Sequence, residues 1–103
     1  MIEDKILHDR LVNDYDYDEK GVQYAIDKIK ALTPEIYTAF EVWFNTGTVQ
    51  EIEVEGYTVA SLRKKNPRMN IIAAYLNLDF LKREPEKAKI AINKLHIPLR
   101  PQL

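Results

Sequence analysis

The chain has 103 residues, of which 46% are hydrophobic and 30% charged, and it contains no cysteine. This composition is ordinary for a folded globular protein and excludes a disordered chain as the default. Without cysteine, disulfides and thiolate-based zinc or redox sites are excluded. The length fits one domain, so we expect a single helical domain over residues 1–103.

Neither a leader nor a membrane span is expected. The first ten residues, MIEDKILHDR, show no basic region followed by an apolar run. The most apolar stretch, Met69 to Leu81, is too short to span a bilayer and carries Asn77 and Asp79. We therefore expect a cytoplasmic protein that does not contact a membrane.

The net charge of −1 hides an asymmetry between the two halves of the chain. Residues 1–55 hold five basic and thirteen acidic side chains, a net charge of −8. Residues 56–103 hold ten basic and three acidic side chains, a net charge of +7. Such polarity occurs in proteins that bind nucleic acid or a charged partner, and also where two halves of one fold face each other. Both interpretations stay open.

The first half of the chain predicts three helices. Apolar residues at helical spacing predict the first helix, which is followed by a polar turn at 13–18. Asp18 is a good N-cap for the second helix, and Thr33-Pro34 supplies a capping hydroxyl and a first-turn proline for the third. Gly47 suits the end of that helix because it accepts a left-handed conformation. The expected ranges are 2–13, 19–32 and 34–45.

Residues 49–54 change to a period of two, which predicts a half-buried strand. Glu55-Gly56 fits a two-residue turn leading into Tyr57, so a small β-hairpin is expected around Val49 to Tyr57.

Three helices are expected after this hairpin. Thr58 is the predicted cap of a short helix that ends near Lys65, before Asn66-Pro67. Asn70 is the predicted cap of the next helix, and Pro85 begins the last one. The expected ranges are 59–65, 71–83 and 85–95, followed by an extended C-terminal tail at 96–103.

The predicted fold is therefore mainly α: a compact bundle of five or six short helices with one small β-hairpin, for which α+β is the alternative label. The core residues should lie on the apolar faces of the longer helices. They are Ile26, Ile29, Phe40, Trp43, Phe44, Ile72, Leu76, Phe80 and Ile92.

Motifs for metal binding or catalysis are incomplete. Asp14, Asp16 and Asp18 have the spacing of the first three ligands of a calcium loop, but the glycine and the bidentate glutamate that such a loop needs are missing. His8 and His96 lie at opposite ends of the chain, and Ser61 lacks a glycine-flanked nucleophile turn. We predict no catalytic residue, no cofactor, no metal site and no enzymatic activity.

Residues 58–81 have the outline of a helix-turn-helix, and Arg63, Lys64, Lys65 and Arg68 cluster at its turn. Cations there are suited to neutralising phosphates. A helix that reads base edges must expose polar side chains at successive turns. The second helix of this segment is instead almost entirely apolar, which indicates that it is buried.

The leading hypothesis is a non-catalytic interaction or regulatory module that binds another protein or a second copy of itself, because the oppositely charged halves suit docking to a charged surface. The alternative is a nucleic-acid-binding protein that uses segment 58–81, with the basic cluster at 63–68 touching phosphates.

Overall fold

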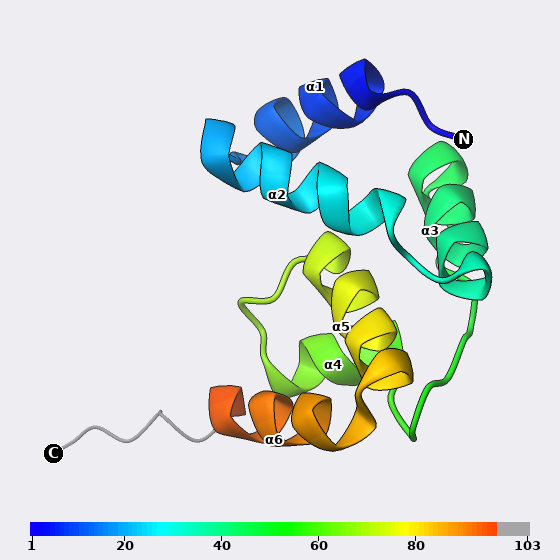
Figure 1. Cartoon of the computed structure of the whole chain (residues 1–103), viewed down its shortest axis with the longest axis vertical. Coiled ribbons are helices and arrows are strands. Elements are labelled where there is room, and N and C mark those ends of the chain that lie inside the picture. The colour runs from blue at the N-terminus through cyan, green and yellow to red at the C-terminus, as the bar shows by residue number, and fades with distance from the viewer. Residues whose placement is uncertain (97–103) are drawn as a thin grey trace, which may run out of the picture. The chain divides into compact units, whose positions relative to one another are not determined.

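The computed structural model describes residues 1–96 (Figure 1), and the side chains of residues 1–94. The described residues form six α-helices, so the prediction of a mainly helical fold is confirmed. These helices are α1 (Asp4–Tyr15), α2 (Glu19–Lys30), α3 (Pro34–Thr46), α4 (Val59–Lys65), α5 (Ile71–Arg83) and α6 (Pro85–His96). None of them is long and apolar enough to cross a membrane.

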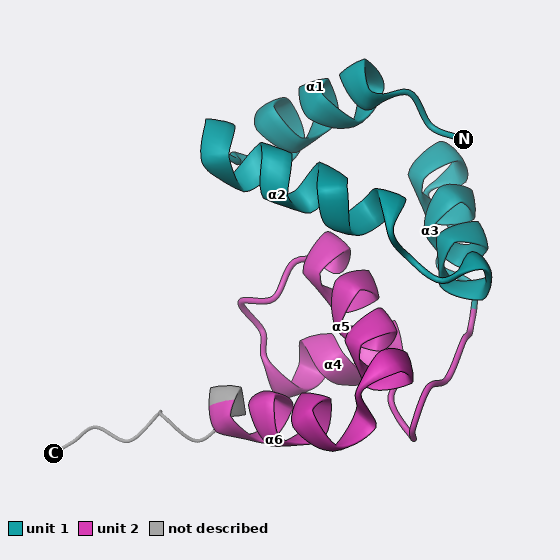
Figure 2. Cartoon of the chain, viewed as in Figure 1, with its two compact units in different colours: residues 1–50 teal, residues 51–103 magenta. Residues whose placement is uncertain are grey.

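The chain divides into two compact units (Figure 2): unit 1 is Met1–Gln50 and unit 2 is Glu51–Leu103. Unit 1 contains α1 to α3, and unit 2 contains α4 to α6. The expectation of a single domain over residues 1–103 stays a prediction, and each unit is described by itself.

Asp18 and Gly47 cap helices of unit 1 as predicted, but α1 runs over Asp4–Tyr15 rather than 2–13, and α2 ends at Lys30 rather than at 32. The Asp18 side chain accepts a hydrogen bond from the Gly21 backbone N–H at 2.8 Å and so caps α2. Gly47 ends α3 with φ 80°, a conformation that costs glycine little. Thr33 precedes α3, but its side chain makes no capping hydrogen bond. Pro34, at the first position of α3, carries the start signal instead.

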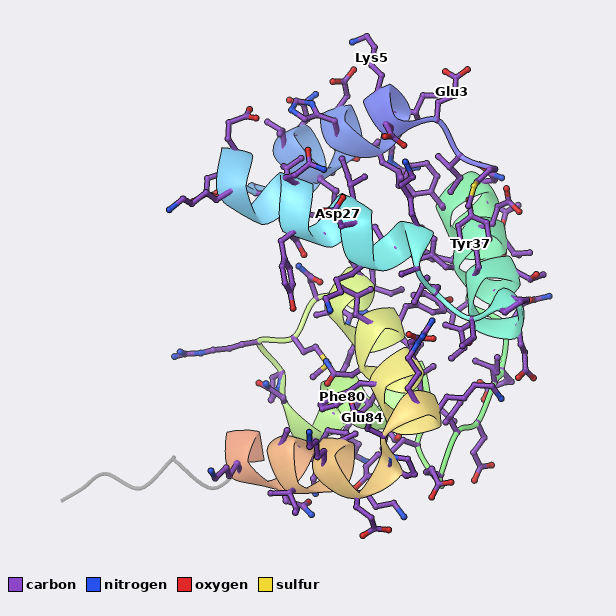
Figure 3. All side chains as sticks on the ribbon, viewed as in Figure 1. Glu3, Lys5, Asp27, Tyr37, Phe80 and Glu84 are labelled. Atoms are coloured by element: carbon purple, nitrogen blue, oxygen red, sulfur yellow. The ribbon has the colours of Figure 1, made fainter. Side chains whose placement is uncertain are left out.

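An aromatic cluster on α3 is part of the buried core. Phe40 is fully buried, and its ring centroid lies 5.7 Å from that of Trp43 and 5.9 Å from that of Phe44. The Arg10 guanidinium of α1 lies 4.1 Å from the Phe44 ring centroid and donates to the Phe44 carbonyl at 2.7 Å. Tyr37 of α3 is labelled in Figure 3, and its hydroxyl accepts a hydrogen bond from the Ile2 backbone N–H at 2.9 Å. The segment before α1 and α1 itself are therefore both tied to α3.

Unit 2 is built around α5, which contacts both α4 and α6. Thr58 and Ser61 form a reciprocal capping box at the start of α4, and Asn70 caps α5 through the Ala73 N–H at 2.8 Å. Both helix starts were predicted from these residue types. The fully buried side chains of α5 include Tyr75, Leu78 and Leu81.

The predicted β-hairpin at 49–57 is wrong. Among the described residues, the only pairing in this region is one antiparallel bridge between Val54 and Tyr57, with N···O distances of 2.8 and 2.9 Å. Glu55 and Gly56 form the expected tight turn with φ of 53° and 84°, but no strands extend from it. Residues 48–53 have no regular structure and are largely exposed, because no neighbouring strand lies beside them to complete a sheet.

The predicted core is confirmed in part. Seven of the nine residues are buried: Ile26, Ile29, Phe40, Trp43, Phe44, Ile72 and Ile92. Leu76 and Phe80 are only partly buried, since α5 is covered on the side of Tyr75, Leu78 and Leu81. A helix that is apolar all round does not reveal from its sequence which side is covered.

The end of the chain differs slightly from the prediction within the described part. His96 is the last residue of α6 rather than the first of an extended tail. The rest of the predicted tail, 97–103, lies outside the described residues.

Candidate functional site

The basic cluster found in the sequence lies where α4 ends and the α4–α5 turn begins. Arg63, Lys64 and Lys65 form the last turn of α4, and Arg68 follows in the turn. We call these four residues the basic corner. No aspartate or glutamate occurs between Gly56 and Leu78, so the basic corner lies in a segment with no carboxylate side chain.

The four cations do not point the same way. Consecutive residues of a helix are rotated by about 100° and do not face each other. Arg63 and Lys64 are exposed, whereas Lys65 is partly buried. Arg68 is exposed as well. The structure therefore brings three cations, and not all four, to the surface of the corner.

The backbone that carries these cations is held in place by local hydrogen bonds. The Asn66 side-chain oxygen accepts from the Arg68 N–H at 3.3 Å, and the Asn66 carbonyl accepts from the Met69 N–H at 2.9 Å. Met69 is buried and anchors the end of the turn. Arg63 Nε donates to the Met69 carbonyl at 3.3 Å, which holds its guanidinium beside the turn. The corner is thus a defined surface, in which Asn66 and Met69 fix the turn.

Three other cations of unit 2 have carboxylate partners. Lys89 Nζ lies 2.9 Å from Glu55 Oε1, Arg83 Nε lies 2.7 Å from Asp79 Oδ2, and Lys87 Nζ lies 3.3 Å from Glu84 Oε1. In contrast, Arg63, Lys64 and Arg68 form no ion pair with any residue that the structure describes. The charge of these three cations is available to a partner.

The second helix of the helix-turn-helix outline is α5, which exposes few polar side chains that could contact the edge of a base. The only exposed residues of α5 are Lys82 and Arg83, in its last turn. The Asn77 amide donates to the Ala73 carbonyl of its own helix at 2.9 Å, and Asp79 is buried with Arg83 as its partner. Base readout by α5 is therefore unsupported, and only phosphate contact from the basic corner stays open.

The acidic residues at the α1–α2 turn take part in the turn and its hydrogen bonds rather than in a metal site. Asp16 adopts a left-handed conformation with φ 60°, Asp18 caps α2, and Asp14 Oδ2 lies 3.5 Å from Arg10 Nε. Within the described residues, no group of three or more histidine or acidic side chains is arranged to hold a metal ion. The calcium-like spacing in the sequence thus corresponds to a capped turn.

His8 bridges α1 to the start of α2. Its Nδ1 lies 3.2 Å from Asp9 Oδ1, and its Nε2 lies 3.5 Å from Glu19 Oε2. The hydrogen bond with Asp9, aided by Glu19, raises the pKa of His8 above 6.5. The side chain of His96 is not among those described, so only His8 has a defined environment.

Comparison with known proteins finds no matching family model, no similar curated protein and no similar solved structure. The site is therefore argued from its own residues.

Sequence reasoning located the basic corner but missed which of its cations are exposed. The 100° step between helix neighbours already indicated that Arg63, Lys64 and Lys65 spread around α4. Sequence reasoning also missed the ion pair between Asp79 and Arg83, although a spacing of four residues on one helix predicts such a pair.

Proposed function

We propose that this chain is a non-catalytic module that binds another protein through the basic corner. The observation that carries this proposal is the exposed group Arg63, Lys64 and Arg68, which forms no ion pair within the part of the chain that the structure describes. These cations lie on a segment without carboxylates whose backbone is held by local hydrogen bonds. Arg83, Lys87 and Lys89 have carboxylate partners within the chain, whereas the three exposed cations of the basic corner are positioned for an acidic surface on a partner. Cytoplasmic action is part of this proposal, since a chain without cysteine needs no oxidising compartment to fold.

The test compares two triple variants of the full chain as bait in a lysate of the native host. R63A/K64A/R68A removes the exposed cations of the basic corner, and K28A/K87A/K94A removes three exposed cations elsewhere. We expect the wild type and the second variant to retain the same proteins, identified by mass spectrometry, and the first variant to lose them. Equal capture by all three baits contradicts the proposal.

Non-specific contact with nucleic acid is the second candidate function, favoured by the same exposed cations. It predicts that a mixed-sequence duplex is retarded in a gel at low salt and released as salt rises, with a slope of roughly one counterion per phosphate contact. R63A/K64A/R68A should weaken this binding alike on all sequences, because phosphate contacts carry no sequence information. Absence of any retardation at micromolar protein removes this candidate.

A further inference from the structure

We infer that the partner of the basic corner is a second copy of this chain, which docks through the turn between α1 and α2; this inference rests on the proposed function. The acidic corner is our name for Asp14 at the end of α1, Asp16 and Asp18 in the turn, and Glu19 at the start of α2. All four residues are exposed. In this arrangement the acidic corner of one copy binds to the basic corner of another copy.

The two corners match in charge and in length. The acidic corner holds four carboxylates within the six residues 14–19 and no cation. The basic corner holds four cations within the six residues 63–68, three of them exposed, and no carboxylate. The charge asymmetry also follows the division of the fold, since unit 1 has five basic and ten acidic side chains and unit 2 has ten basic and six acidic. Complementary charge at this scale steers encounter and fixes the orientation of docking.

The acidic corner is structurally defined as well. The Tyr17 N–H donates to the Leu11 carbonyl at 3.1 Å, which closes the end of α1, and Asp18 caps α2. The side chains keep their exposure despite local pairing: Asp14 is 56% exposed beside Arg10 and Glu19 is 86% exposed beside His8. Little ordering of the backbone is therefore needed when the corner meets a cationic surface.

The overall charge permits copies to approach each other. A net charge of −1 gives almost no mutual repulsion, and proteins near zero net charge tend to associate. The two corners are different surfaces, so copies can associate either reciprocally, as a two-fold dimer with two such contacts, or head to tail, as open chains. In both cases we expect the mean mass to grow with concentration.

The experiment is sedimentation equilibrium of the full chain at low and at high salt. At an ionic strength of about 0.01 M, where the Debye length is roughly 30 Å, the mean mass of the wild type should rise with concentration above 12.0 kDa. At about 1 M salt, where this length is roughly 3 Å, the mass should return to the monomer value. A wild type that stays monomeric at low salt overturns the inference, as does association that salt does not weaken.

Two neutralising variants identify the surfaces. R63Q/K64Q/R68Q removes the exposed charge of the basic corner, and D14N/D16N/E19Q removes charge from the acidic corner while keeping Asp18 as the cap of α2. Each should lower the association constant by about tenfold or more, because several exposed ion pairs are lost together. The control K28Q/K87Q/K94Q changes the net charge as much as the basic variant does and should associate like the wild type.

Mixing the two neutralising variants is the sharpest part of the experiment. Each retains one intact corner, so together they should form pairs, and the mass should stop at that of two chains. Failure of the mixture to associate overturns the inference. If the wild type is monomeric while capture from lysate still depends on the basic corner, the second copy is excluded as partner and the proposed function stands. If capture does not depend on the basic corner, the proposed function itself fails.

Discussion

In unit 1, Arg10 lies against the Phe44 ring and donates to the Phe44 carbonyl. In unit 2, Arg63 donates to the Met69 carbonyl and forms no ion pair with any side chain among residues 1–94, which are the ones described. Arg10 lies in the middle of α1 and Arg63 in the last turn of α4, and their surroundings differ. A cation held by a ring face, a carbonyl and a carboxylate contributes to folding. A cation that is exposed and has no carboxylate partner is available for binding. Residue type alone does not separate these two roles.

The largest expected difference between the two units is the change in the free energy of unfolding when Arg10 or Arg63 is replaced by alanine. Arg10→Ala should lower the free energy of unfolding by about 2 kcal/mol, since it removes a charge-assisted hydrogen bond and a cation–π contact. Arg63→Ala should change it by no more than about 0.5 kcal/mol, as is usual for an exposed surface residue. Urea denaturation followed by the fluorescence of Trp43 and by circular dichroism measures both. Arg10→Lys is the matched control: it keeps the charge but loses the planar fork, so part of the loss should persist. Equal losses for Arg10→Ala and Arg63→Ala contradict the comparison.

The glycines with positive φ should instead behave alike in the two units. Gly47 has φ 80° in unit 1 and Gly56 has φ 84° in unit 2, and an added Cβ would meet nothing within 4 Å at either position. Gly47→Ala and Gly56→Ala should therefore each cost about 1 kcal/mol from backbone strain alone. Thermal unfolding of both variants measures this cost, with Gly47→Asn as a control that tolerates the conformation better. A much larger loss at one site means that its side-chain space is not open.

The smallest expected effects are those of pH on stability, and they fall in different pH ranges in the two units. In unit 1, hydrogen bonding to Asp9 raises the pKa of His8 above 6.5, so the stabilisation from protonated His8 is complete below pH 6.5 and is lost as pH rises through the raised pKa. In unit 2, the hydrogen bond to Glu55 raises the pKa of Lys89 above 10.5, so its contribution is lost only above pH 10.5.

An NMR titration of the His8 ring should show a midpoint above 6.5. In His8→Gln, the difference in stability between about pH 6 and pH 8 should shrink. A His8 midpoint at or below 6.5 shows that Asp9 and Glu19 do not favour the charged ring in solution.

Much of the secondary structure was readable because the signals are local. Asp18, Thr58 and Asn70 each cap the helix that was predicted from them, and Gly47 ends α3. These residues act on backbone groups within three or four positions, so their effect does not depend on distant parts of the chain. The strand at 49–54 failed because a strand needs a hydrogen-bonded neighbour, which alternation of side chains does not supply.

The features of the candidate site also divide into those that the sequence determined and those that only the tertiary structure decided. The sequence determined that four cations cluster at 63–68 with no carboxylate nearby, that α5 is too apolar to read bases, and that charge differs between the two halves of the chain. Only the tertiary structure decided that Lys65 is partly buried while Arg63, Lys64 and Arg68 are exposed, and that Leu76 and Phe80 lie at the edge of the core rather than inside it. Exposure depends on which neighbouring element covers each side of a helix, and that is a property of packing between segments far apart in the chain.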